Sequence, residues 1–296
     1  MAEYTKRGMS EKPLSGCSEA LSRALRVGKG ATLFFYLDPY GIKDLEFEMV
    51  KQIYERDTSQ STEVLINFNF KTFMRMSGNW TYRDSATEVA CKVKASKIET
   101  VNNVMGGEYW LGIITDPKLD KIQREDAVVG AYVDRVRQFF KYTYSMPVKE
   151  QDNSPCRVPV DELAKYHLIF GTRSPRALVY MNDVANIALE PYFTQFKDGL
   201  LFPMTPKRYE PSSAEEVKQA ILKAVEGQPM TRPKIYEAVV PWFFVHYRSR
   251  DYRAMIDELV FKEHRLFPDN TTMKRKNQLN DQTLLSTKPW PRGGGK

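Results

Sequence analysis

Cysteine is scarce in this chain of 296 residues, and the three that occur lie far apart. Cys17, Cys91 and Cys156 stand 65 or more positions from one another, whereas zinc sites and disulfide frameworks need cysteines at short, paired spacings. The pattern therefore predicts free, reduced thiols and excludes a small fold held together by disulfides or structural zinc.

Long apolar runs are also absent. No stretch approaches the about 18 to 20 consecutive apolar residues that a membrane-spanning helix needs. Residues 1–7 lead into sequence rich in Ser, Gly and Lys, without the continuous apolar centre of a secretion signal. With 42% hydrophobic residues the chain has enough apolar material for a globular core, and we expect a cytoplasmic protein.

The most informative stretch that is present is an apolar run that stops abruptly. Leu33–Leu37 reads as a buried strand and is followed by Asp38, Pro39, Tyr40 and Gly41. In open α/β sheets, ligands bind beyond the carboxyl ends of the strands, where backbone polar groups become free. The Asp38 carboxylate and the Pro39 carbonyl would be acceptors and Tyr40 a stacking face, which suits a planar amine such as that of a nucleobase. The other interpretation is an ordinary strand-to-helix turn, for which Asp-Pro-x-Gly is a common composition.

The residues after this turn predict a second strand beside the first. Lys43–Arg56 has apolar residues at helical spacing, and Thr62–Asn67 is a strand of buried type. Strand, helix and strand in this order predict a parallel pair with a right-handed crossover, which would put Asn67 at the same sheet edge as Asp38. Asn67 is therefore a fourth candidate for the site, unless it only ends its strand.

The next segments predict more elements of the same domain. We expect the polar residues 77–118 to form an irregular excursion and 120–140 to form a long helix. The segments 141–148 and 166–172 read as two strands of an antiparallel hairpin, and a helix begins at Ser174-Pro175.

Three prolines within nine residues, Pro203, Pro206 and Pro211, mark a linker between two domains. Beyond the linker, three short helical segments and a hairpin are typical of a winged helix-turn-helix, whose third helix enters the major groove. The predicted organisation is a flexible lead-in at 1–30, a partial Rossmann-like α/β domain at 31–202, the linker at 203–211, the winged helix-turn-helix domain at 212–290 and a disordered tail at 291–296.

The charge balance favours a polyanionic partner. The chain has 44 Lys and Arg against 37 Asp and Glu, a net charge of +7, and basic residues crowd into its C-terminal part. We expect cations on and near the third helix and the hairpin tip to bind the phosphates of nucleic acid, with DNA as the expected polymer. These candidates are Arg232, Lys234, Arg248, Arg250, Arg253, Lys274, Arg275 and Lys276. A basic face used for protein contacts is the alternative. We expect Trp242-Phe243-Phe244 to lie in the core of the winged helix, with a stacking platform as the other interpretation.

Four motifs in order connect the chain to a known family. They are Phe35–Gly41, Glu63–Phe68, Tyr166–Thr172 and Met181–Asp183, and with the C-terminal winged helix they resemble the three-Cys-motif partner (TcmP) family over about residues 31–290. The resemblance implies a class I S-adenosylmethionine-dependent methyltransferase-like protein, in which the Asp-Pro-aromatic turn is the catalytic motif of amino-methylating enzymes. It also implies a separately encoded radical S-adenosylmethionine protein as a partner and, by analogy of architecture, a role in phage defence.

The cofactor-binding half of such an enzyme is not recognisable. Class I methyltransferases bind S-adenosylmethionine with a glycine-rich turn after the first strand, ahead of the catalytic turn, yet only 37 residues precede Asp38. Gly28-Lys29-Gly30 lies ahead of its strand, and Gly106-Gly107 follows no clear strand. No cofactor-binding residue is assigned, and we expect a fragment, a truncated variant or a half that another chain completes.

Two further hypotheses stay open. A non-catalytic adaptor would dock a partner on the half-sheet and hold nucleic acid with the winged helix. A metal-dependent nuclease would need clustered acids beside a lysine, but Asp84, Glu88 and Lys92 are spaced like a polar helix face. We expect His167 and the other histidines to be structural, and we predict no metal site.

Overall fold

The computed structural model describes residues 17–28, 30–39, 42, 45–56, 61–77, 88–148, 164–194, 211–273 and 278–290. The chain is a mixed α/β protein, which confirms the predicted class. It forms two compact units, Met1–Gly171 and Thr172–Lys296, and their boundary falls earlier than the proline-rich linker that the sequence predicts. No helix within the described segments is long and apolar enough to cross a membrane.

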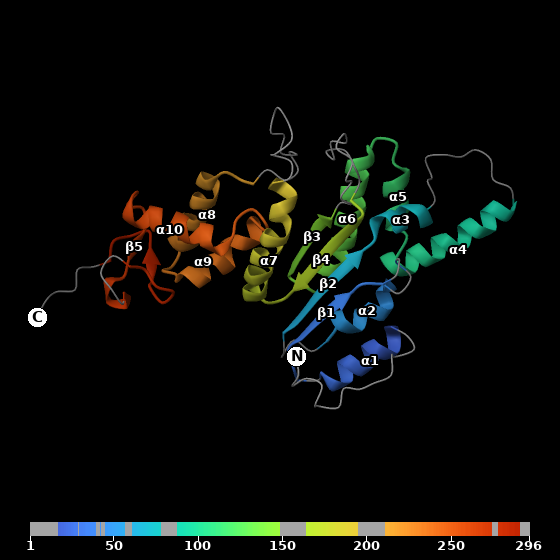
Figure 1. Cartoon of the computed structure of the whole chain (residues 1–296), viewed down its shortest axis with the longest axis horizontal. Coiled ribbons are helices and arrows are strands. Elements are labelled where there is room, and N and C mark those ends of the chain that lie inside the picture. The colour runs from blue at the N-terminus through green and yellow to red at the C-terminus, as the bar shows by residue number, and fades with distance from the viewer. Residues whose placement is uncertain are drawn as a thin grey trace, which may run out of the picture. The chain divides into compact units, whose positions relative to one another are not determined.

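A four-stranded mixed sheet organises the N-terminal unit, with the strands in the order β1-β2-β4-β3 (Figure 1). Its strands are β1 (Leu33–Leu37), β2 (Thr62–Phe68), β3 (Tyr142–Val148) and β4 (Tyr166–Thr172). β1 and β2 run parallel, in a register that pairs Leu33 with Thr62 and Leu37 with Ile66. All four strands lie where the sequence predicts them, and β1 forms one edge of the sheet.

Six helices belong to the described part of this unit. They are α1 (Cys17–Val27), α2 (Phe47–Tyr54), α3 (Phe70–Met76), α4 (Glu88–Met105), α5 (Tyr109–Thr115) and α6 (Lys121–Arg137). The helices predicted at 43–56 and 120–140 are confirmed as α2 and α6. α6 begins at Lys121 because Asp120 and Gln123 form a reciprocal capping box around its first turn.

The prediction of an irregular excursion at 77–118 was wrong, because the segment contains α4 and α5. Trp110 of α5 is fully buried, and its indole N–H donates to Asn102 Oδ1 of α4 at 2.9 Å. Val101 and Val104 of α4 are buried in the same core. The polar residues of this segment obscured the apolar residues, among them Val101, Val104 and Trp110, that the two helices bury.

The two faces of the β1–β2 pair differ in burial. Val64, Ile66 and Phe68 of β2 lie fully buried in a core that also holds residues of α2 and α6. Phe34 and Tyr36 of β1 face the other way, and 54% and 53% of their surface is exposed. Since alternate residues of a strand point to opposite faces, a side chain two residues beyond Tyr36 continues this exposed row.

The C-terminal unit consists of helices and a small sheet. Its elements in the described segments are α7 (Pro175–Thr194), α8 (Ala214–Glu226), α9 (Arg232–Val239), η5 (Val240–Trp242), α10 (Ser249–Phe261), β5 (Phe267–Pro268), η6 (Asn270–Thr272) and β6 (Leu285–Ser286). β5 and β6 are antiparallel, and the backbone of Met230 forms a bridge to Leu285. The three predicted helices and the hairpin are therefore present, and α7 packs against α9 and η5 within the same unit.

Local signals set where α8 begins and which face it buries. The side chain of Ser213 accepts from the Glu216 N–H, and the Glu216 side chain accepts from the Ser213 N–H in return. Val217, Ile221 and Val225 then recur at helical spacing and are buried where α8 meets α9 and α10. Capping and periodicity agree here, which is why the sequence located this helix well.

Candidate functional site

The carboxyl ends of β1 and β2 bring two predicted site residues together. Asp38 follows β1 directly, and Asn67 follows Ile66, the residue that pairs with Leu37. Parallel pairing therefore places the two side chains side by side on one face of the sheet. Asn67 Nδ2 donates to Asp38 Oδ1 at 2.7 Å, which confirms that Asn67 is a neighbour of the turn.

Tyr36 is a third member of this site that the sequence did not single out. It stands two residues before Asp38 on the exposed face of β1, and its hydroxyl interacts with the side chains of Asp38 and Asn67. Partial burial raises the pKa of Tyr36, and the charge of Asp38 and a hydrogen bond to it raise it further. The signal was the two-residue spacing, since residues i and i+2 of a strand share a face. We refer to Tyr36, Asp38 and Asn67 as the sheet corner.

The sheet corner can accept hydrogen bonds from a ligand. Asp38 is exposed, so the rest of its carboxylate can be reached from solvent. Asn67 Oδ1 is buried and has no hydrogen-bond partner in the part of the chain that the structure describes. A buried acceptor without a donor is unfavourable, but this oxygen has almost no surface open to solvent, so the exposed Asp38 carboxylate is the acceptor that a ligand can reach. Pro39 is half-buried, while Tyr40 lies outside the described residues, so its stacking role stays a prediction.

The described residues do not fit S-adenosylmethionine. Such a site would need a glycine-rich turn between a strand and a helix, but Asn69 caps α3 directly after β2, and Ser174 caps α7 after β4. Gly106 has a φ of +67°, yet it follows helix α4, and a Cβ there would lie 2.7 Å from the ring of Phe47. Gly106 therefore permits close packing of α4 on α2 and forms no cofactor cradle.

Arg232 lies in a different environment from the one that the sequence predicts for it. Only 4% of its surface is exposed, and its guanidinium donates to Asp257 of α10 and to the carbonyl oxygen of Leu279, the latter at 3.3 Å. These bonds tie α9 to α10 and to the segment that precedes β6. Arg232 thus stabilises the unit, and we remove it from the phosphate-binding set.

Three other predicted phosphate contacts are exposed cations. The side chains of Lys234, Arg250 and Arg253 are 67%, 69% and 57% exposed. Arg250 lies 3.5 Å from Asp251, and Arg253 lies 3.8 Å from Asp281. Ion pairs this long and this exposed contribute little, so both arginines can exchange them for phosphates.

The remaining predicted phosphate contacts are less well defined. Arg248 is half-buried directly before α10, and the hairpin-tip residues 274–276 lie outside the described segments.

The expectation that Trp242 belongs to the core was wrong, because 79% of its surface is exposed at the end of η5. An exposed indole offers a flat face of the kind on which bases of single-stranded nucleic acid stack.

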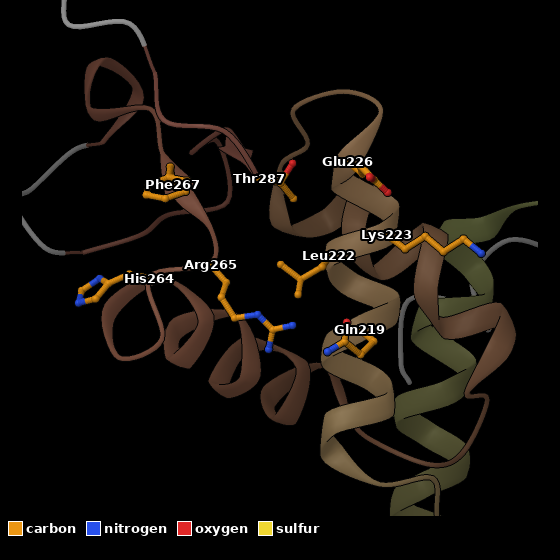
Figure 2. A pocket seen from close by; sticks show the side chains of 8 residues that line it. All are labelled: Gln219, Leu222, Lys223, Glu226, His264, Arg265, Phe267 and Thr287. Carbon is orange, nitrogen blue, oxygen red and sulfur yellow. The ribbon is translucent and has the colours of Figure 1, made fainter.

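A hollow on the C-terminal unit lies between α8 and the segment around β5. Its lining consists of Gln219, Leu222, Lys223, Glu226, His264, Arg265, Phe267 and Thr287. Figure 2 shows Leu222 and Arg265 pointing toward one another, whereas Lys223 and His264 point away. Arg265 already donates to Glu215 and Glu263, so its charge is balanced within the protein. We assign no ligand to this hollow.

The histidines occupy positions that agree with structural roles. His167 is buried, with its Nε2 2.6 Å from Glu125 Oε1 and its Nδ1 2.9 Å from Ser145 Oγ, and so links β4 to α6 and β3. His246 Nδ1 accepts from the Ser212 N–H at 3.1 Å, and burial lowers the pKa of His246.

Neither the side chains of the described residues nor comparison with known proteins assigns a metal site or a family. Within the described segments, no group of three or more His, Cys, Asp or Glu could hold a metal ion, and the acids around Glu88 fall outside the described side chains. Comparison of the chain with protein-family models, curated proteins and solved structures finds no match. Any function therefore has to be argued from the sheet corner and the C-terminal unit themselves.

Proposed function

We propose that this chain is a TcmP-like, methyltransferase-like protein that holds the exocyclic amine of a nucleobase at the sheet corner and binds nucleic acid through its C-terminal unit. The observation that carries the proposal is the 2.7 Å hydrogen bond from Asn67 Nδ2 to Asp38 Oδ1. It joins the ends of two parallel strands at the point where α/β proteins bind ligands.

The hydrogen-bonding pattern of the sheet corner favours an amino group over other ligands. Asn67 fixes one carboxylate oxygen of Asp38 and leaves its own Oδ1 without a donor. An amine that donates to the exposed carboxylate of Asp38 would fit this pattern, whereas an anion would be repelled by Asp38. Tyr36 offers a half-exposed aromatic ring beside the acceptors, on which a flat base can lie.

Methyl transfer itself belongs to the family resemblance rather than to residues of this chain. S-adenosylmethionine would supply the methyl group, but the described residues form no cradle for it. The role that we propose for Asp38, Asn67 and Tyr36 is to bind and orient the acceptor base. The separately encoded radical S-adenosylmethionine partner stays part of the proposal on resemblance alone.

The C-terminal unit supports nucleic-acid binding by its charge and its arrangement. Residues 172–296 contain 20 Lys and Arg against 14 Asp and Glu, so nearly all of the net charge of +7 belongs to this unit. Three helices followed by an antiparallel pair match the order of a winged helix-turn-helix, in which α10 would be the reading helix. Arg250 and Arg253 on α10 would then bind phosphates.

Binding to DNA that contains one unpaired adenine tests the proposal, because an unpaired base leaves the stack easily. We expect Asp38→Ala and Asn67→Ala to weaken binding by about tenfold and about threefold, as a charge-assisted and a neutral hydrogen bond are lost. Glu48→Ala removes another exposed carboxylate, on α2, and serves as the matched control. Equal affinities for all four proteins would exclude the sheet corner as the base site.

A non-catalytic adaptor is the second candidate, and one observation favours it. β1 is an edge strand whose exposed face carries Phe34 and Tyr36, and nothing in the described chain forms a cofactor cradle. Exposed sheet edges are templates for strand addition by a partner. The adaptor would bind nucleic acid with the same salt dependence but would not distinguish bases that carry an amine.

A further inference from the structure

Two neighbouring side chains of α7 hold the loop that leads into α10. Asn182 is fully buried, and it uses both ends of its amide on this loop. Its Nδ2 donates to the carbonyl oxygen of Tyr247 at 2.8 Å, and its Oδ1 accepts from the Val245 N–H at 2.7 Å. One side chain therefore fixes two peptide groups that are 63 and 65 positions away in the chain.

Asp183 supplies an acceptor for the first amide of α10 and so adds to a local contact, in which Asp251 Oδ2 accepts from the Arg248 N–H. Asp183 Oδ1 accepts from the Ser249 N–H, the first amide of α10, at 2.8 Å. The residue at the N-cap position is Arg248, whose side chain has no acceptor for this amide. The negative charge of Asp183 also lies at the positive end of the helix dipole of α10.

The loop between η5 and α10 is held in a conformation that it would not adopt unaided. Val245 has a φ of +68°, a left-handed backbone that is a genuine outlier for a β-branched residue. Such strain persists only where surrounding contacts determine the conformation. The Val245 N–H is itself one of the donors that Asn182 holds.

We propose that Asn182 and Asp183 are positioning residues through which α7 controls the orientation of the nucleic-acid-binding surface of α10. We call this coupling of α7 to α10 the lever. While α7 holds the loop, Val245 stays strained, α10 stays capped, and Arg250 and Arg253 are presented in one orientation. A shift of α7 would break these bonds together, relax Val245 and release the N-terminal end of α10.

β4 ends at Thr172 and α7 begins at Pro175, so the lever starts three residues after a strand of the sheet. The inference rests on the proposed nucleic-acid binding.

The test combines amide hydrogen exchange with binding to a fluorescein-labelled DNA duplex. Asp183→Ala should speed exchange at Ser249, and Asn182→Ala should speed it at Val245, with no change at Ile221 in α8. We expect each alanine variant to bind DNA about tenfold more weakly, since a half-buried hydrogen bond that orders the start of α10 is lost. Asp183→Asn keeps an acceptor for the Ser249 N–H and should restore binding to within about threefold of the unchanged protein.

The outcomes separate this inference from the function on which it rests. Faster exchange at Val245 and Ser249 with unchanged DNA affinity would overturn the lever. Failure of the unchanged protein to bind DNA would overturn the proposed function, and the lever with it. If Asn182→Ala loses protection at Ile221 as well, Asp183→Ala decides, because Asp183 is only half-buried and its loss leaves both Asn182 hydrogen bonds to the loop in place. Weaker DNA binding by this variant would support the lever, and unchanged binding would overturn it.

Discussion

The two units each contain an Asn–Asp pair, and the pairs differ in how completely their hydrogen bonds are satisfied. In the C-terminal unit, Asn182 donates to Tyr247 and accepts from Val245, while Asp183 accepts from Ser249. In the N-terminal unit, Asn67 donates to an exposed Asp38, and its carbonyl oxygen has no partner in the described chain. A satisfied pair builds structure, whereas the half-satisfied pair at the carboxyl ends of β1 and β2 leaves an exposed carboxylate for a ligand.

The largest expected effect is on the stability of the C-terminal unit. Asn182→Ala removes the partner of the Val245 N–H and of the Tyr247 carbonyl, two groups of half-buried residues, which should lower the free energy of unfolding by about 2 to 4 kcal/mol. Asn67→Ala should lower it by about 1 kcal/mol or less, since that hydrogen bond is partly exposed. Urea denaturation measures both values. Equal losses for the two variants would remove the distinction between the pairs.

The next effect concerns the charges of α10. Replacing Arg250 and Arg253 together by Glu should weaken duplex binding by about tenfold or more and lower the salt slope by about two. Lys223→Glu changes an exposed cation of α8 that the proposal leaves out and should not alter the slope. Fluorescence anisotropy at several salt concentrations gives the slopes. A similar change for all variants would show that only net charge matters.

A third prediction concerns the cofactor. Because the described residues form no cradle for it, titration of S-adenosylmethionine into the chain should give no saturable heat. Isothermal titration calorimetry measures this directly. Tight one-to-one binding would contradict our interpretation of the glycines and would favour an enzyme that is complete in one chain.

The smallest effect is a pH dependence of the C-terminal unit. Hydrogen bonds from Lys218 and Lys262 lower the pKa of Glu258 to about 2, and Lys218 also lowers that of Glu263. A carboxyl group whose pKa is lower in the folded protein than in the unfolded chain stabilises the fold at pH values above its pKa in the unfolded chain. This contribution is lost as the pH falls toward 2. Thermal unfolding should therefore shift downward between about pH 4.5 and 2, by less in Lys218→Met. An identical shift in that variant would assign the effect to other groups.

Sequence reasoning located the sheet corner because its geometry depends on strand pairing, which follows from local patterns. Asp38 and Asn67 had to meet once two parallel strands were placed in order. The same reasoning failed for Arg232, because a count of charges does not reveal that Asp257 and a backbone carbonyl bury its guanidinium. Sequence reasoning also placed the helix that begins at Pro175 in the α/β domain, whereas α7 belongs to the C-terminal unit. The contacts that hold it there were not visible in the sequence, because the partners of Asn182 lie more than 60 positions away.

One measurement tests the central claim most directly, which is that the sheet corner binds the amine of a base. The measurement is the affinity for two DNAs, one with an unpaired adenine and one in which that base is replaced by purine, which lacks the amine. Both DNAs are bound to the unchanged protein and to Asp38→Ala. We predict that the unchanged protein prefers adenine by about tenfold and that Asp38→Ala abolishes the preference, a coupling of about 1.4 kcal/mol. Affinity losses that add independently, within about 0.3 kcal/mol, would contradict the proposed site.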